Sequence, residues 1–247
     1  MSKTIENSTY KKVILKTLRN DKKSFCPFRK EKQMDYLFSE LKKDFRKKHL
    51  KIFEAGCGYG RLIYFLNEFD SNQEYFGADY VGQLIREGKR SFSNNKNITL
   101  FHLDVFKLPN SFRKLFDISI SYKTLSWFPG YEEFIKQIVK VTKKKIYITS
   151  LFYDGDIDFI TKIYVNAQDN DKNFSYLNTY SFPKFKKFCR SVGIKKVRAI
   201  DMHVDFDIKR PKDMNVLQTY TVSLSRGERL EITGNTILNW KLIELTL

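Results

Sequence analysis

Residues 54–60 read Glu54-Ala55-Gly56-Cys57-Gly58-Tyr59-Gly60. Their first two residues end a short apolar run, 50–55, that predicts a β-strand, and the glycines follow it. Glycine has no Cβ and tolerates a left-handed backbone, so a turn of this composition lets a ligand approach the main chain closely. The next segment, 61–66, has the apolar density of a helix, so the turn would also present N–H groups at a helix start. The stretch therefore predicts a ligand site at the end of a first parallel strand.

Two common glycine-rich motifs do not fit this turn. A dinucleotide fingerprint, G-x-G-x-x-G, requires glycine or alanine at the position that Arg61 occupies, which disfavours NAD. A phosphate-binding P-loop would continue with Gly-Lys-Ser or Gly-Lys-Thr, and neither follows.

Around the turn, short apolar runs alternate with amphipathic stretches, which is typical of βα units and a mostly parallel sheet. An apolar-periodic helix is predicted before them at 34–45. The other predicted strands lie at 75–79, 98–103, 116–121 and 145–151, and the predicted helices at 82–92 and 131–142.

Beyond residue 152 the pattern changes. Residues 153–180 predict an irregular excursion, and Ser181 followed by Pro183 predicts a helix that runs to Ser191 and stops at Gly193. The remainder predicts a hairpin, 219–223 with 229–233, and a last strand at 237–245. The fold class predicted is α/β, Rossmann-like: a mostly parallel seven-stranded sheet with helices on both faces, an antiparallel C-terminal strand pair and a β-hairpin elaboration.

The 247 residues, 42% of them hydrophobic, suit a single domain. Within it we expect an N-terminal helical or lid segment at 1–45, a ligand-binding core at 50–151 and an acceptor side at 152–247. The chain has no apolar run long enough to span a membrane and no secretory signal, so we expect a cytoplasmic protein. Cys26, Cys57 and Cys189 lie far apart, which indicates neither a disulfide framework nor a metal site.

Forty-five Lys and Arg residues against 28 Asp and Glu residues give a net charge of +17. Such a balance can favour polyanions such as RNA. The lysine runs, for example Lys143-Lys144-Lys145, instead fall at the edges of apolar segments, a distribution typical of helix ends and turns. We therefore favour scattered, solvated charge over a nucleic-acid surface.

Two aspartates stand at the ends of predicted strands. Asp79 lies 19 residues past Gly60, where a carboxylate can accept both hydroxyls of a ribose. Asp104 ends the third predicted strand, where it could accept the exocyclic amine of an adenine. An isolated aspartate at a strand end is usually a turn former, but together with Asp79 and the glycines it predicts an adenosine site.

With these motifs in order, residues 50–151 resemble the cofactor half of class I S-adenosylmethionine-dependent methyltransferases. The resemblance implies S-adenosyl-L-methionine as cofactor, a role for Glu54 in orienting its methionine end, and backbone contacts from Ser121 or Tyr122 to the methionine amino group. The predicted cofactor residues are the motif positions and their neighbours: Glu54, Gly56, Cys57, Gly58, Gly60, Asp79, Tyr80, Asp104, Val105, Ser121 and Tyr122.

A second resemblance concerns the acceptor. The segment 219–245, with Gly234 and Trp240, and the tetrapeptide 178–181 resemble small-molecule methyltransferases of bacterial surface-polysaccharide biosynthesis. This implies methyl transfer to oxygen or nitrogen of a small polar molecule, such as a sugar, a nucleotide-linked sugar or a glycan precursor. An RNA methyltransferase, favoured by the charge, is the alternative, and a cofactor-binding scaffold without transfer activity is the third hypothesis.

The acceptor site should lie past strands four and five, because ligands of open α/β sheets bind at the carboxyl ends of strands. Where base-methylating relatives carry Asp/Asn-Pro-Pro-aromatic, this chain has Ser121-Tyr122-Lys123-Thr124, which disfavours nucleobase amines. Tyr153 and Asp156 follow the fifth strand, and His203, near two aspartates, is the titratable candidate for a base. We take these three residues as the catalytic candidates.

Overall fold

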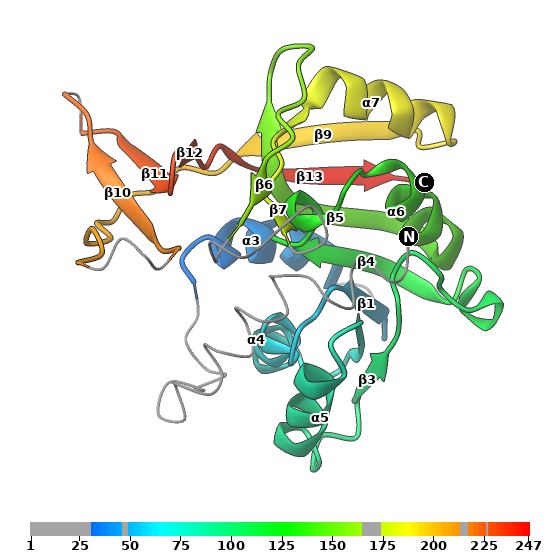
Figure 1. Ribbon diagram of the computed structural model, residues 1–247. Helices are drawn as coiled ribbons and strands as arrows, with labels where there is room; N and C mark the ends of the chain where they lie inside the picture. Colours follow the sequence, from blue (N-terminus) through cyan, green and yellow to red (C-terminus); the bar gives the residue numbers. More distant parts are fainter. Residues whose placement is uncertain (1–30, 46–48, 165–173, 213–216, 226) are drawn as a thin grey trace.

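The computed structural model describes residues 31–45, 49–164, 174–212, 217–225 and 227–247. An eight-stranded sheet forms the centre of the molecule (Figure 1). Seven strands follow the order β3-β2-β1-β4-β5-β13-β9, and β8 pairs with the end of β5. Neighbouring strands are parallel except at β13, which runs antiparallel to both β5 and β9. Their bounds are β1 Lys51–Ala55, β2 Glu74–Asp79, β3 Ile98–His102, β4 Phe116–Tyr122, β5 Thr142–Tyr153, β8 Tyr180–Ser181, β9 Lys196–Asp201 and β13 Trp240–Thr246.

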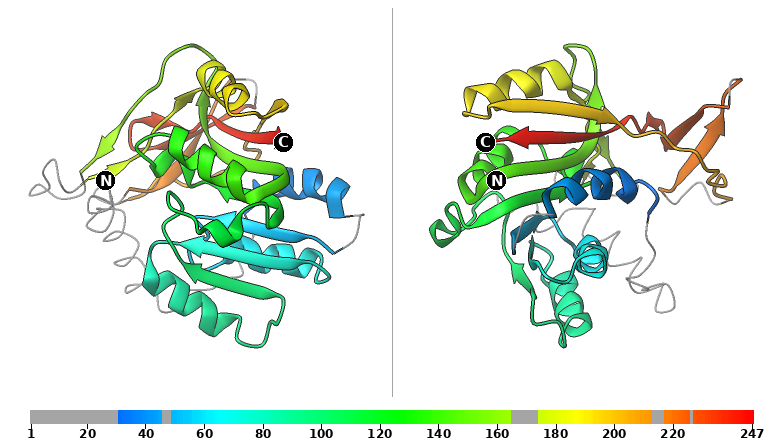
Figure 2. Two further views of the ribbon diagram at one scale, coloured as in Figure 1. Left: turned by 90° about the vertical axis from the view of Figure 1, so that its right-hand side faces the viewer. Right: turned by 180° about the vertical axis from the view of Figure 1, so that it is seen from behind.

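Helices cover both faces of the sheet (Figure 2). Successive side chains of β1 point to opposite faces, so Ile52 packs with the helices α3 (Met34–Phe45), α4 (Arg61–Phe69) and α5 (Gly82–Ser91). Phe53 packs instead with α6 (Glu132–Val141) and α7 (Phe182–Ser191). The predicted fold class is confirmed, with β8 raising the strand number from seven to eight.

The predicted elements agree closely with the observed ones, apart from β5 and the last strand. Helix α3 has the predicted bounds, and the Ser181 hydroxyl caps α7 by accepting the N–H of Lys184 at 3.3 Å. Strand β5 begins at Thr142, three residues before the predicted start. The reason is side-chain pairing: the buried Thr142 hydroxyl lies 2.6 Å from that of Ser119 on β4, so a polar stretch is held in the sheet.

The C-terminal tail divides between two sheets. The predicted hairpin is present as β10 (Thr219–Ser223) and β11 (Arg229–Thr233), and with β12 (Thr236–Ile237) it forms a separate three-stranded sheet that projects from the body (Figure 1). The predicted last strand is therefore split. Leu238 donates its N–H to Glu231 in the small sheet, whereas the Asn239 side chain donates to the Phe152 carbonyl in the large one.

The excursion after β5 contains the two-stranded sheet β6 (Lys162–Ile163) and β7 (Ser175–Tyr176). Residues 165–173 of the predicted excursion lie outside the described residues. Two short 3-10 helices, η1 (Asn110–Phe112) and η2 (Leu125–Trp127), flank β4. No helix in the described ranges has the length and apolarity to cross a membrane. Cys57 and Cys189 are free and buried, and Cys26 lies outside the described residues.

Candidate active site

The glycine turn joins the end of β1 to the start of α4. Gly56, Gly58 and Gly60 have φ values of 78°, 57° and 89°, in the left-handed region that a Cβ makes costly. The N–H groups of Gly56 and Cys57 both donate to the Ala78 carbonyl, at 2.8 and 3.1 Å, which ties the turn to β2. The predicted turn is thus present and is fixed against the neighbouring strand.

The three glycines differ in their surroundings. A Cβ on Gly56 would lie 2.4 Å from the Thr124 side chain, and one on Gly60 would lie 2.7 Å from the Phe92 ring. Among the described residues, a Cβ on Gly58 would meet only Leu84, at 3.9 Å. The space beside Gly58 is therefore open to a ligand, whereas Gly56 and Gly60 are also required by close packing.

Asp79, the last residue of β2, is held against the turn. Its Oδ2 atom accepts the N–H of Gly58 at 2.9 Å and its Oδ1 atom accepts that of Val81 at 2.8 Å. Burial raises the pKa of Asp79, and the two N–H groups and His102 offset only part of that rise. Each carboxylate oxygen keeps a lone pair that can accept a ribose hydroxyl. The next residue, Tyr80, is half-buried, and its carbonyl oxygen lies 2.8 Å from His102 Nε2.

Glu54 lies on β1 immediately before the turn and is 3% exposed. Burial, together with the nearby charge of Asp79, raises its pKa well above the usual value. Within the described ranges, its Oε2 atom has no hydrogen-bond partner, and neither has the buried hydroxyl of Ser121 on the adjacent strand β4. Buried polar atoms normally find a partner, so both fit a site that a polar ligand completes.

Asp104 lies between β3 and a tight turn. Its Oδ1 atom accepts the N–H of Phe106 at 2.9 Å, and its carbonyl accepts that of Lys107 at 2.9 Å. The turn-forming role of this aspartate is therefore present, and among the described residues no hydrogen bond reaches its second carboxylate oxygen, which could accept one from a ligand. Val105 beside it is buried in the core between β1 and α6, so a cofactor contact from it stays a prediction.

At the exit of β4 the structure contains a cluster of charges that the sequence analysis did not identify. Glu31, three residues before α3, accepts from three donors: its Oε1 lies 2.9 Å from an Arg61 guanidinium nitrogen, and its Oε2 lies 2.9 Å from Lys123 Nζ and 3.0 Å from the Tyr122 hydroxyl. Lys123 has a φ of 57°, in the left-handed region. We call Glu31, Arg61, Tyr122 and Lys123 the edge cluster.

The edge cluster extends to the C-terminal tail. Lys123 Nζ donates to the Gln33 side chain at 2.6 Å, and Gln33 donates to Glu231 of β11 at 2.7 Å. Lys123 Nζ also lies 4.9 Å from the centre of the Trp240 ring, within cation–π range. Burial raises the pKa of Glu231, an effect that Lys123 partly opposes. These partners are 90 to 198 residues apart in sequence, a separation that leaves no local pattern to detect.

The three catalytic candidates lie at or after the ends of two strands: Tyr153 is the last residue of β5, Asp156 follows it, and His203 follows β9. Tyr153 is 41% exposed and its ring packs edge-on against Phe159, and Asp156 is exposed on the following loop. The His203 side chain is exposed, and its peptide N–H donates to the Tyr36 hydroxyl of α3 at 3.1 Å. Within the described ranges, no hydrogen bond or ring contact joins the three to one another.

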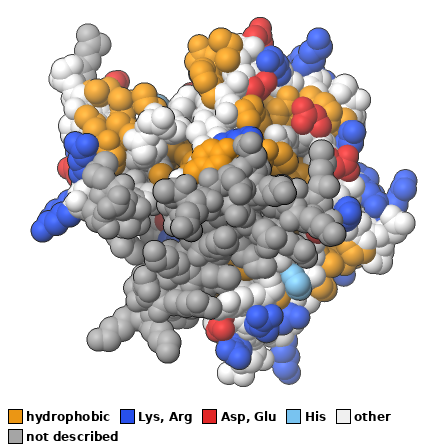
Figure 3. Space-filling model, in the orientation of Figure 1, with side chains coloured by type: hydrophobic (Ala, Val, Ile, Leu, Met, Phe, Trp, Pro, Cys, Tyr) orange, Lys and Arg blue, Asp and Glu red, His pale blue; other side chains and the backbone are white. Residues whose placement is uncertain are grey.

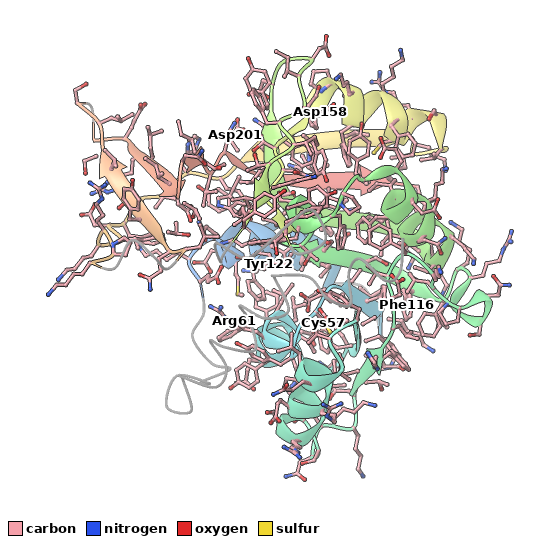
Figure 4. The ribbon with its side chains drawn as sticks, viewed as in Figure 1. Cys57, Arg61, Phe116, Tyr122, Asp158 and Asp201 are labelled. Carbon is pink, nitrogen blue, oxygen red and sulfur yellow. The ribbon has the colours of Figure 1, made fainter. Side chains whose placement is uncertain are left out.

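Between them lies a buried lysine that sequence analysis also missed. Lys241 of β13 is 4% exposed, and its Nζ forms ion pairs with Asp154, after β5, and with Asp201 at the end of β9. Figure 4 shows Asp201 on the upper part of the sheet, apart from Arg61, Cys57 and Tyr122, which gather around the start of α4. The described residues therefore form two groups: the glycine turn with the edge cluster, and the ends of β5 and β9.

Comparisons with known proteins agree with this geometry. Residues 46–201 match the model of a family described as a methyltransferase domain. The fold is similar to magnesium protoporphyrin IX methyltransferase from Synechocystis PCC 6803, solved with S-adenosylmethionine bound, with 13% identity, a TM-score of 0.62, and coverage of 100% of this chain and 97% of that one. It is also similar to 1,6-didemethyltoxoflavin-N1-methyltransferase from Burkholderia thailandensis, solved with S-adenosylhomocysteine, with 12% identity, a TM-score of 0.60, and coverage of 96% and 87%. No curated protein matches by sequence.

Proposed function

The chain belongs to the methyltransferase domain family, whose model spans more than half of its length, and from this premise we propose that it transfers a methyl group from S-adenosylmethionine to oxygen or nitrogen of a small polar acceptor. One observation carries the cofactor assignment. The left-handed Gly58 leaves open space beside the turn, and its N–H is held by a buried carboxylate, Asp79, that can also accept ribose hydroxyls.

The residues present fit the cofactor from end to end. Asp79 would hold the ribose, Asp104 offers an acceptor for the adenine amine, and the unpartnered oxygen of Glu54 would receive the methionine end. When bound, S-adenosylmethionine supplies an electrophilic methyl group on a sulfonium. The chain then has to orient the acceptor for in-line displacement and exclude water, and a base is needed only for a poorly acidic acceptor.

The acceptor would bind past the exits of β4 and β5. Cofactor motifs occupy the ends of β1, β2 and β3, which leaves this part of the carboxyl edge to the second substrate. The excursion after β5 and the tail sheet stand beside it in the fold (Figure 1). A sugar, a nucleotide-linked sugar or a glycan precursor is the acceptor that we propose, on the resemblance of the tail and of residues 178–181.

The distribution of charge favours a small acceptor over RNA. On the face shown in Figure 3, Lys and Arg side chains of the described residues form separate groups, most of them around the margin, with acidic side chains among them. Several lysines are also engaged in ion pairs, as in Lys144 with Asp117 at 2.9 Å. An RNA-binding face concentrates basic residues in one patch.

The proposal is tested in two steps. Calorimetry with S-adenosylhomocysteine should show binding to the full chain, and its absence would remove the cofactor assignment. Transfer of a labelled methyl group should then be followed with sugars, sugar nucleotides and cell extract as acceptors. Cofactor binding without transfer to any acceptor would favour a scaffold that has lost the activity.

A further inference from the structure

In the edge cluster the Glu31 carboxylate accepts from three donors, Arg61, Tyr122 and Lys123, which we call the cradle. These donors lie at the start of α4 and at the end of β4. Arg61 begins α4 directly after the glycine turn, and Tyr122 and Lys123 stand at the end of β4, the strand next to β1. The carboxylate comes from elsewhere, from Glu31 ahead of α3. The donors and the carboxylate thus belong to different parts of the fold. The donors are positioned by α4 and β4, and not by Glu31.

The cradle is suited to an oxyanion. Both oxygens of Glu31 are engaged, one by a guanidinium and the other by an ammonium and a phenol hydroxyl. Charge-assisted hydrogen bonds of this kind recognise carboxylate and phosphate groups alike. Although burial alone would raise the pKa of Glu31, Lys123 and Arg61 hold it below the usual value, so the cradle favours the anionic form.

Lys123 is held in place at a conformational cost. Its φ of 57° is one that residues with a Cβ rarely adopt, and such positions gather at functional sites. The conformation brings its ammonium to Glu31 and Gln33, just before α3, and over the ring of Trp240 at the start of β13, so its three partners come from two distant parts of the chain. A simple surface ion pair would not need a strained backbone.

We propose that Arg61 and Lys123 bind an anionic group, a carboxylate or phosphate, of the methyl acceptor, and that Glu31 occupies this site until the acceptor displaces it. The inference rests on the proposed function, because it places the anion beside the glycine turn to which we assign the cofactor. It makes the acceptor an acidic or phosphorylated small molecule, a class that includes acidic sugars and sugar nucleotides.

The test uses inorganic phosphate as the probe and the full chain in calorimetry at constant ionic strength. Glu31→Gln removes the competing charge, so phosphate should bind at least tenfold more tightly than to the wild type. Adding Lys123→Gln to that variant should abolish the gain. Asp158→Asn is the matched control, since it releases Lys184 from an ion pair of the same length, 2.9 Å, outside the edge cluster, and it should bind phosphate as the wild type does.

Saturating S-adenosylhomocysteine distinguishes the two possible sources of the anion. If the cradle serves the acceptor, the gain of Glu31→Gln persists in the presence of the cofactor product. If the product abolishes it, the two cations hold the methionine carboxylate and our assignment is wrong. An unchanged phosphate affinity in Glu31→Gln, or an equal gain in Asp158→Asn, also overturns it.

Folding is checked by the affinity for S-adenosylhomocysteine, which a folded Glu31→Gln variant retains. If that variant does not fold, Glu31→Asp, which shortens the competing side chain by one methylene, should still bind phosphate at least threefold more tightly than the wild type, and no gain would contradict the inference. Failure of the proposed function is a separate result: the wild type would then either not bind S-adenosylhomocysteine or bind it without transferring a methyl group to any acceptor.

Discussion

Asp79 accepts the N–H of Gly58 through its Oδ2 atom at 2.9 Å, so the carboxylate assigned to the ribose also fixes the middle of the glycine turn. One side chain at the end of β2 therefore joins the two motifs that lie nearest the proposed adenosine. Any change to Asp79 acts on both the ligand contact and the shape of the turn.

We first predict that Asp79→Ala weakens S-adenosylhomocysteine binding by about 1.5 to 3 kcal/mol, since it removes charge-assisted hydrogen bonds to the ribose. Calorimetry measures the change. Asp117→Asn is the control, because Asp117 accepts the N–H of Lys51 at the opposite end of β1, at 3.1 Å, and should not affect binding. Wild-type affinity in Asp79→Ala would exclude Asp79 from the site.

The second prediction separates ligand approach from packing within the turn. Gly58→Ala places a Cβ in open space, so it should cost only about 1 to 2 kcal/mol of stability, from the left-handed backbone, while it obstructs the cofactor. Gly56→Ala adds a clash with Thr124 and should cost roughly 2 to 5 kcal/mol. Urea unfolding and calorimetry report the two effects separately.

Gly193→Ala is the control for this series. Gly193 has a φ of 89°, and no atom of the described residues lies within 4 Å of the added Cβ, so the substitution adds backbone strain without a clash. It should lose a similar amount of stability to Gly58→Ala and keep its cofactor affinity. If Gly58→Ala binds S-adenosylhomocysteine as tightly as Gly193→Ala does, the cofactor does not approach the turn at Gly58.

The third prediction concerns the buried Glu54. Its folded pKa is raised by burial and by Asp79, so between the unfolded and folded pKa values the folded protein binds more protons than the unfolded chain. Stability should therefore fall as pH rises through that window. Glu54→Gln removes this contribution, so its stability relative to the wild type should increase from pH 4.5 toward alkaline pH. If urea unfolding gives parallel pH profiles for the two proteins, ionising Glu54 costs the folded protein no stability and the prediction is wrong.

The sequence predicted the parts of the fold that depend on local pattern. The glycine turn, α3 and the Ser181 cap depend on neighbouring residues, and the structure contains each of them. The split of the last strand was not predictable, because Ile237 and Leu238 continue the apolar pattern and only contacts to two different sheets separate β12 from β13.

The edge cluster was beyond sequence reasoning for a related reason. Lys123 follows β4 as an ordinary lysine in a chain with 45 Lys and Arg residues, and Glu231 belongs to a hairpin that looks solvent-exposed in sequence. Folding brings α3, β4 and the tail sheet together and buries Glu231 to 6% exposure. A charge whose partner is 90 or more residues away has no spacing from which its role can be inferred.

The fourth prediction distinguishes small acceptors from RNA. If the net charge of +17 is scattered, mixed RNA should bind weakly at low salt and dissociate at physiological salt, because the attraction arises mainly from counterion release. Filter binding across a salt series measures this. Selective binding to one RNA sequence or structure at physiological salt would instead support the alternative function.

The last prediction assigns acceptor specificity to residues at and after the ends of β5 and β9. Tyr153, Asp156 and His203 lie outside the glycine turn, so Tyr153→Phe, Asp156→Asn and His203→Ala should lower turnover while the affinity for S-adenosylhomocysteine stays unchanged. A loss above about a hundredfold for His203→Ala alone would identify it as a general base, since positioned proton transfer typically contributes about 10²- to 10⁴-fold. Because the His203 side chain is exposed, it could act as a base only if the bound acceptor contacts it directly. Lys123→Gln, in the edge cluster, should raise KM whatever these three variants do, and if all three turn over normally the acceptor does not contact the ends of β5 and β9.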